Sequence, residues 1–538
     1  MGDGKFHKVE VPASASAKPR WGVLEIASFL CGAAVMVLEM AGSRIVAPYM
    51  GTSLIVWTSL IGVIMASLSV GYWLGGVAAD RWPKTEILAR IVLGAAFFTA
   101  VTAFAANPIL TVLFRAFSRS AFYFSSAAGA LLLFAAPSVL LGMVSPFIVK
   151  LAMRDLGSSG TTVGRFSALS SLGSILGTFL GGFVLISLFA AGTILLLVAG
   201  VLAFVAALLY RAAWSAKWRN AAFFCAAFLA LFGAATSLGM PMMPPGEHID
   251  TAYNHIWVAE EIRPNGQRAR YLMTASIGEG AQSVIYTKNP TELVSSYTKF
   301  YDLAFHYKPD TKKILMLGGG GYCVPRYLLA TRPEVSIDVV EIDPGITDTA
   351  RKYFFLQDQG NPNIAIYHED ARIFLNRMAD VRMADARIAG GQSQGLYDAV
   401  FADVFGAWYS IPFHLATVEA ARKMYDLLNE DGVLISNVIS ALEGPRSGVF
   451  DGIYAAVAQV FPKVLIFPAM SVDARSAGYR QNLMLVALKS EKTFDAASPP
   501  GNPEMARLLS YRWTPPFNPA VPPFTDAFAP VEHYALVE

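Results

Sequence analysis

The chain has 538 residues, a mean hydropathy of +0.45 and only 15% charged residues. An average soluble chain carries about 25% charged residues, so this composition excludes a disordered protein, a coiled coil and a nucleic-acid binder that relies on a basic surface. The formal net charge of +2 conceals a division of the chain. Residues 1–240 hold 16 Lys and Arg against 7 Asp and Glu, whereas residues 241–538 hold 26 against 33. The two parts therefore predict two kinds of domain.

The first part is rich in long apolar segments. A helix that spans a membrane needs about 20 mostly apolar residues. Seven segments have the length and composition of such spans: Val23–Met40, Leu54–Leu74, Ile87–Ala105, Ala127–Val149, Phe166–Phe189, Thr193–Tyr210 and Ala221–Leu238. The stretch Pro108–Phe124 carries Arg115 and Arg119, so we expect it to be an interfacial helix. The sequence thus predicts an N-terminal tail over 1–21 and an α-helical, multi-span transmembrane domain over 22–240.

Small residues in the fifth segment indicate how it packs. Helices approach closely in lipid where small side chains repeat along one face. We therefore expect a helix-packing seam at Ser170, Ser174, Gly177 and Gly181.

The basic residues of the first part predict its orientation. Lys and Arg are enriched in the N-terminal tail and in alternate loops, which favours a cytoplasmic N-terminus. With seven spans, everything after residue 240 would then lie outside the cytoplasm. One miscounted segment, either Pro108–Phe124 or a re-entrant final helix, would place it inside.

The second part predicts β-strands that alternate with helices. Residues 241–311 are expected to form a linker and a small β-strand domain, with strands near 256–260, 270–273 and 283–285. Residues 312–490 predict an α/β doubly wound, Rossmann-like domain, because helical stretches separate most of its strands. Those strands are expected at 314–317, 336–340, 364–367, 399–402, 433–438, 464–467 and 483–487. Residues 491–538 remain as a C-terminal extension.

Glycines and acids follow successive strands of this domain. The run Gly318–Gly321 stands between a strand and a helix, where the missing side chains let the backbone approach a ligand. Glu341 ends the next strand, at the position of an acid that holds ribose hydroxyls. Asp370 and Asp403 follow two further strands, so the three acids are expected in one nucleoside-binding crevice. The alternative is that they are ordinary helix caps and turn residues.

Other kinds of site have no support in the sequence. It contains no HExxH zinc motif, no CxxC pair and no phosphate-binding loop of the G-x-x-x-x-G-K-[ST] type. We therefore expect no metal and no nucleic acid among its partners.

The second part resembles the spermidine synthase family of polyamine aminopropyltransferases. The motifs that carry the resemblance are Gly318-Gly-Gly320, Val340-Glu-Ile-Asp343, Glu369-Asp-Ala371 and Tyr397-Asp-Ala-Val-Phe-Ala-Asp403, with Tyr253, Gln282 and Tyr297 upstream. With the apolar helices ahead of it, the chain is similar to bacterial membrane-fused members of that family.

The resemblance implies roles for these residues. The donor would be decarboxylated S-adenosylmethionine, or S-adenosylmethionine itself, as co-substrate. It would be bound by Gly318, Gly319, Gly320, Glu341, Asp370, Ala371 and Gln282. Asp403 would be the catalytic carboxylate that orients the attacking amine or takes its proton. Tyr253 and Tyr297 would contact the acceptor.

The resemblance also implies a location and partners. Because such donors are made in the cytoplasm, we expect a multi-pass protein of the plasma (inner) membrane with a cytoplasmic catalytic domain. The lipid bilayer and a small amine or lipid-soluble acceptor are the expected partners, and a homodimer is a further expectation.

The chain departs from the family pattern where acids or polar contacts are expected. Asn254, Gly321, Thr298, Lys299 and Gly406 occupy such positions, and Glu279 or Glu292 could supply acids in their place. Three functions therefore stay open: aminopropyl transfer to an amine, methyl transfer from S-adenosylmethionine to an amine or lipid-soluble acceptor, and a transporter or sensor with a non-catalytic nucleoside-binding domain.

Overall fold

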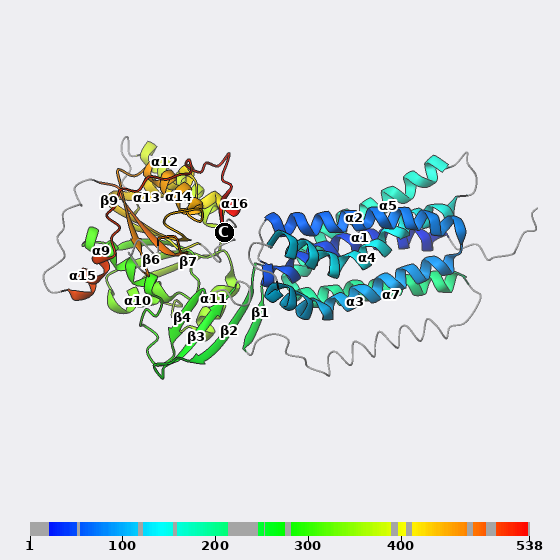
Figure 1. The fold of residues 1–538 in the computed structure, drawn as a ribbon, viewed down its shortest axis with the longest axis horizontal. Helices are drawn as coiled ribbons and strands as arrows, with labels where there is room; N and C mark the ends of the chain where they lie inside the picture. The colour runs from blue at the N-terminus through cyan, green and yellow to red at the C-terminus, as the bar shows by residue number, and fades with distance from the viewer. Residues whose placement is uncertain are drawn as a thin grey trace, which may run out of the picture. The chain divides into compact units, whose positions relative to one another are not determined.

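The computed structural model describes residues 21–50, 54–116, 122–153, 159–213, 246–251, 253–274, 281–388, 396–404, 412–470, 477–490 and 502–535. The chain divides into two compact units, one helical and one that contains residues 243–538. Each has its own architecture (Figure 1).

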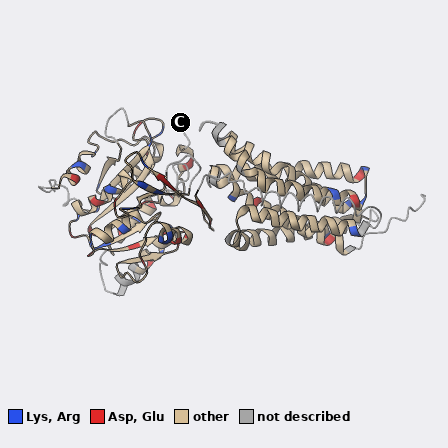
Figure 2. Cartoon of the chain, turned by 90° about the horizontal axis from the view of Figure 1, so that it is seen from below, with Lys and Arg blue, Asp and Glu red and all other residues tan. Residues whose placement is uncertain are grey.

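The helical unit is built from six long apolar helices. They are α1 (Trp21–Met50), α2 (Leu54–Arg81), α3 (Thr85–Ala116), α4 (Phe122–Ala152), α5 (Ser159–Phe179) and α7 (Ala191–Ala213). A π-helical turn, η2 (Leu180–Leu185), and the short α6 (Ile186–Leu188) follow α5. By length and composition, six helices among the described residues are able to cross a membrane. Lys, Arg, Asp and Glu lie mostly at the ends of these helices (Figure 2). The seventh predicted segment, 221–238, lies outside the described residues.

Helix α3 corrects one expectation. We predicted that residues 108–124 form an interfacial helix of their own, but residues 108–116 continue α3, with Pro108 inside it. Leu, Phe and Ala around Pro108 are compatible with a helix. The proline removes only the helix hydrogen bond that its own backbone nitrogen would have donated. Residues 117–121 lie outside the described part, and α4 begins at Phe122.

The predicted small-residue seam is confirmed between α1 and α5. The Ser174 hydroxyl donates to the carbonyl of Gly32 at 3.1 Å. A Cβ added to Gly173 would lie 2.0 Å from the carbonyl oxygen of Phe29, and one added to Gly177 would lie 2.5 Å from that of Ala33. The two backbones therefore touch where only glycine leaves room.

A small antiparallel sheet opens the second unit. Its strands β1 (Glu247–Asp250), β2 (His255–Ile262), β3 (Arg268–Met273) and β4 (Ser283–Tyr286) are ordered by sequence. The predicted strands correspond to β2, β3 and β4, whereas β1 was not predicted. Four residues of mixed polarity give too short a pattern to detect.

The main sheet has seven strands in the order β10-β11-β9-β8-β5-β6-β7. Five neighbouring strands run parallel, and β11 is antiparallel to both of its neighbours, so the sheet is mixed. The bounds are β5 (Lys313–Leu317), β6 (Ser336–Val340), β7 (Ile364–Tyr367), β8 (Tyr397–Ala402), β9 (Leu428–Ser440), β10 (Lys463–Pro468) and β11 (Gln481–Leu488). Each of the seven predicted strands is present.

Helices cover both faces of this sheet. Alternate residues of β5 enter two separate hydrophobic cores, as expected for a buried strand: Ile314 and Met316 enter one, Leu315 and Leu317 the other. The first core includes residues of η3 (Ser296–Asp302), α9 (Leu303–Tyr307), α10 (Cys323–Thr331), α11 (Pro344–Tyr353) and α15 (Pro503–Ser510). The second includes residues of α12 (Ala371–Ile388), α13 (Val418–Leu427), α14 (Gly448–Ala458) and α16 (Val531–Ala535). This is the Rossmann-like architecture, and it brings the carboxyl ends of the parallel strands to one edge.

Candidate active site

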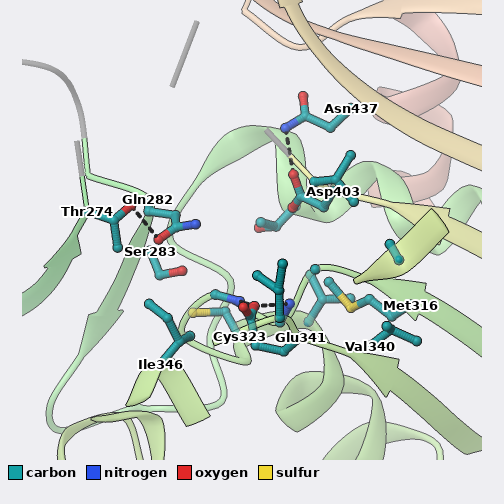
Figure 3. Close-up of a pocket in the computed structure, with 18 of the residues that line it drawn as sticks. Thr274, Gln282, Ser283, Met316, Cys323, Val340, Glu341, Ile346, Asp403 and Asn437 are labelled. Atoms are coloured by element: carbon teal, nitrogen blue, oxygen red, sulfur yellow. Dashed lines mark hydrogen bonds between the residues drawn. The ribbon is translucent and has the colours of Figure 1, made fainter. Parts of the chain in front are cut away.

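A cavity of about 590 Å³ opens at the carboxyl edge of the main sheet. Its walls come from the ends of β5, β6, β8 and β9 and from the connection between β3 and β4 (Figure 3). All ten residues singled out from the sequence line it: Tyr253, Gln282, Tyr297, Gly318, Gly319, Gly320, Glu341, Asp370, Ala371 and Asp403. Their common location follows from the topology, because parallel strands end at the same edge.

The glycine run forms the floor between β5 and α10. Gly318 has a φ of +90°, and a Cβ there would lie 2.2 Å from the carbonyl oxygen of Asp403. Any side chain at this position would therefore meet both backbone strain and a clash. The absence of side chains leaves the backbone as the cavity wall.

Glu341 is locked by the backbone around it. Its carboxylate accepts from the amides of Gly319 at 2.9 Å, Gly320 at 3.3 Å and Asp343 at 3.0 Å. Only 8% of the residue is exposed, and this burial raises its pKa while the three amides oppose the rise. The glutamate thus ties the end of β6 to the glycine run and fixes the shape of the floor.

Asp370 combines a structural role with a place in the cavity. One oxygen accepts from the amides of Arg372 at 2.8 Å and Ile373 at 3.1 Å, which caps the start of α12. The other oxygen lies 3.3 Å from Nε2 of His414, a cavity residue that we did not single out from the sequence. The helix-cap alternative is therefore correct for one of the two oxygens. Ala371 begins α12 directly beside it.

Asp403 follows β8 and faces the cavity opposite Glu341 (Figure 3). Its Oδ1 accepts from the side-chain amide of Asn437 at 2.9 Å. Burial raises the pKa of Asp403, and the hydrogen bond from Asn437 together with the nearby phenols of Tyr297 and Tyr301 opposes the rise. Burial and the Asp403 charge in turn raise the pKa of Tyr297 well above its ordinary value, so Tyr297 stays neutral. A carboxylate with a raised pKa is a better proton acceptor than an exposed one.

The small sheet contributes the opposite wall. The hydroxyl of Thr274 donates to Oε1 of Gln282 at 3.0 Å, so the amide nitrogen of Gln282 is left for the cavity (Figure 3). The oxygen of Ser283 accepts from the amide of Gly321 at 2.8 Å. A Cβ at Gly321 would lie 2.7 Å from the Cβ of Ser283, so an acid cannot occupy this position without displacing that wall.

Asp343 is a supporting residue that the sequence indicated only as part of a motif. It is fully buried and accepts from Thr251 at 2.6 Å and Asn254 at 2.8 Å, while its other oxygen caps α11 through Gly345. The carboxylate thereby holds the turn that carries Tyr253, which is 47% exposed at the cavity.

The departures from the family pattern have separate structural settings. Lys299 is not among the residues that line the cavity, and its Nζ lies 4.0 Å from Glu504 of α15. The hydroxyl of Thr298 donates to the carbonyl of Ser295 at 2.6 Å, and Glu292 accepts from Asn289 at 3.1 Å. Gly406 and Glu279 lie outside the described residues. The positive charge of Lys299 is therefore directed to α15.

The chain is similar to known polyamine aminopropyltransferases. Residues 298–470 match the family model of the spermine/spermidine synthase domain. The polyamine aminopropyltransferase of Vibrio vulnificus is 32% identical over 169 residues, which are 31% of this chain and 51% of the relative. That of Corynebacterium efficiens is 25% identical over 463 residues, 81% of this chain and 80% of the relative. The chain spans about half the length of the first two curated relatives that it matches.

Solved structures of the same kind are similar as well. A probable spermidine synthase from Corynebacterium glutamicum has a TM-score of 0.38 at 18% identity, covering 50% of this chain and 87% of its own. The spermidine synthase of Thermotoga maritima has a TM-score of 0.31 at 17% identity, covering 53% and 84%.

The sheet order and the cavity at its carboxyl edge define an α/β domain of the Rossmann-like, methyltransferase-fold class. Within that class, residues 298–470 match the spermine/spermidine synthase domain, and the curated relatives to which the chain is similar are polyamine aminopropyltransferases.

Proposed function

We propose that the protein is an integral-membrane transferase that moves an aminopropyl group from decarboxylated S-adenosylmethionine to an amine. The observation that carries the proposal is the convergence of Gly318–Gly320, Glu341, Asp370 and Asp403 on one cavity inside a spermine/spermidine synthase domain. Curated relatives bear the name polyamine aminopropyltransferase, which is a transferase activity.

The proposed mechanism assigns a task to each wall. Glu341 accepts hydrogen bonds from the ribose hydroxyls of the donor, and the Asp370 oxygen that does not cap α12 accepts from the adenine amino group. The glycine backbone and Gln282 border the donor, while Tyr253 and Tyr297 border the acceptor. The amine must lose a proton before its lone pair can attack carbon, and Asp403 accepts that proton. The amine lone pair then forms the nitrogen–carbon bond as the carbon–sulfur bond breaks, and 5′-methylthioadenosine leaves with the electron pair on sulfur.

The surroundings of Asp403 suit this task. Its raised pKa strengthens it as a base, and Tyr297 and Tyr301 beside it stay neutral. Bringing the amine and the sulfonium together in a partly closed cavity supplies a further share of the acceleration.

The six apolar helices support the membrane part of the proposal. We place the protein in the plasma membrane, with the second unit on the cytoplasmic side where the donor is made. Membrane extraction tests this placement: the full chain should stay in the membrane fraction after an alkaline carbonate wash and leave it in detergent.

Methyl transfer is the second candidate, and Gly321 is the observation that favours it. The resemblance places an aspartate for the donor's amine at this position, and the packing of Ser283 leaves no room for one. Product analysis separates the candidates. The purified full-length protein is incubated with each donor and a panel of amines, and the nucleoside product is identified by mass. Aminopropyl transfer yields 5′-methylthioadenosine, methyl transfer yields S-adenosylhomocysteine, and neither product would overturn the proposed transferase function.

A further inference from the structure

Two asparagine side chains form a chain of hydrogen bonds that ends on Asp403. Asn482 donates from Nδ2 to Oδ1 of Asn437 at 3.0 Å. Asn437 in turn donates from Nδ2 to Oδ1 of Asp403 at 2.9 Å (Figure 3). Both asparagines line the cavity, and Asn437 is only 2% exposed.

The sheet register explains why the two amides meet. In the antiparallel pair of β9 and β11, Asn482 is opposite Ile439 and Met484 is opposite Asn437. Asn437 and Asn482 are thus diagonal neighbours on the same face of the sheet, within reach of side-chain hydrogen bonds.

The series of two hydrogen bonds fixes the orientation of each side-chain amide. Because Asn482 donates to the carbonyl oxygen of Asn437, the amide nitrogen of Asn437 is the group left for Asp403. A reversed Asn437 would place its carbonyl oxygen against a carboxylate oxygen, which is repulsive. Asn482 therefore acts on Asp403 without touching it.

We propose that Asn437 and Asn482 are positioning residues for the transfer reaction, which hold Asp403 through Oδ1 and leave its Oδ2 to receive the proton of the acceptor amine. This inference rests on the proposed function. It extends that function to two residues outside the motifs by which the family was recognised.

The positioning has a consequence for the ionisation of Asp403. Hydrogen bonding from Asn437 lowers the pKa of Asp403 against the effect of burial. The titratable groups that face this carboxyl among the described residues are Tyr297 and Tyr301 of η3, both neutral. Loss of the amide bond should therefore raise the pKa of Asp403 further, since a hydrogen bond to the charged form favours that form.

The test compares Asn437→Leu and Asn482→Leu with a matched control. The control is Asn429→Leu, because Asn429 donates to Oδ1 of Asp398 at 2.7 Å across the same pair of strands, away from the cavity. Each variant loses a side-chain amide hydrogen bond: Asn482 to Asn437, Asn437 to Asp403, or Asn429 to Asp398. The control therefore reports the purely structural cost of losing such a bond.

Two readouts are measured on the full-length protein in detergent over a range of pH. The first is the rate of transfer: in both cavity variants its acid limb should move up by about one pH unit, because a hydrogen bond to a charged group is worth about that much. At a pH on that limb the rate should be about tenfold lower than in the wild type, and the control should keep the wild-type profile. The second is the affinity for cationic S-adenosylmethionine relative to neutral 5′-methylthioadenosine. This ratio should fall as Asp403 becomes protonated, and the fall should occur at higher pH in both cavity variants.

The two readouts separate the inference from the proposed function. If the wild type transfers no group but the affinity ratio shifts as stated, the proposed function fails and the positioning role stands. If the ratio responds to pH in the same way in wild type and both cavity variants, or does not respond to pH at all, the positioning role is overturned.

Discussion

At the scale of single residues, the site is governed by how its carboxylates are held. Glu341 has both oxygens engaged by backbone amides, Asp370 has one oxygen on a helix N-terminus, and Asp403 has one oxygen on Asn437. A buried carboxylate without such bonds would be protonated or destabilising. Motif residues therefore hold Glu341, whereas Asp370 and Asp403 owe their orientation to groups outside the motifs.

Asp403→Asn is the most direct test of the catalytic assignment. The amide keeps the shape of the side chain but cannot take a proton, so transfer should fall by about 100-fold or more while donor binding persists. Steady-state rates and donor titrations on the same preparation measure the two effects. A variant that keeps wild-type rates would rule out proton transfer to Asp403.

The rate should also depend on pH through Asp403. Burial raises its pKa, and the base is the ionised form, which is populated above that pKa. Activity should therefore be lost as the pH falls through a value higher than the ~3.9 of an exposed aspartate. The initial rate at saturating donor and acceptor, followed from pH 8 downward, measures this; Asp403→Asn should lack the transition.

At the scale of elements, two pairs of segments approach each other so closely that a glycine is needed at the contact. The turn after β5 approaches the end of β8 at Gly318, and α1 approaches α5 at Gly173 and Gly177. Each contact depends on the absence of a side chain, so each can be tested with a single methyl group.

Gly318→Ala should destabilise the protein and weaken donor binding. The added methyl group combines an unfavourable φ with a clash against the Asp403 carbonyl, and we expect a loss of about 3 kcal/mol or more in the free energy of unfolding. Gly444→Ala is the control, since Gly444 has a similar φ of +86° but open space around it. It should cost about 1 kcal/mol from strain alone. Equal losses in thermal unfolding would contradict the clash.

Gly173→Ala should loosen the packing of α1 against α5. The new methyl group would meet the Phe29 carbonyl, whereas Gly164 on the same helix has nothing within 4 Å. Gly173→Ala should lower the unfolding temperature in detergent by several degrees, and Gly164→Ala should leave it nearly unchanged. A matched rise in both variants would show that helix propensity, not the seam, sets stability, because alanine favours helix more than glycine.

At the scale of the whole molecule, residues 1–240 carry an excess of basic residues and residues 241–538 an excess of acidic residues. Basic residues of the first part gather at the ends of apolar helices, whereas the second part carries acids throughout an α/β domain. The number of membrane spans decides on which side residues 241–538 lie, because an even number of spans returns the chain to the side on which its N-terminus lies.

We expect both ends of the chain on the cytoplasmic side. Charge bias favours a cytoplasmic N-terminus, and the proposed donor is cytoplasmic. A reporter that is active only in the cytoplasm, fused in turn before Met1 and after Glu538, should be active in both positions. Activity only at the N-terminus would indicate an odd number of spans and would place the second unit outside.

The sequence by itself determined the elements and the residues of the cavity. Short runs of apolar residues identified ten of the eleven strands in the described part of the chain, and long apolar segments identified six of its helices. The positions of Gly318, Glu341, Asp370 and Asp403 after successive strands were enough to predict that they line one cavity, since parallel strands end at one edge.

Only the tertiary structure decided how these residues are held. The pairs Asn482–Asn437, Asp370–His414 and Ser283–Gly321 join segments 38 to 45 residues apart by side-chain contacts that leave no local pattern. It also showed that β1 exists, that α3 runs through Pro108, and that Lys299 is directed to Glu504. The physical reason is the same in each case: local sequence fixes periodicity and backbone preference, whereas the partner of a polar group depends on which distant segment the fold brings within about 3 Å of it.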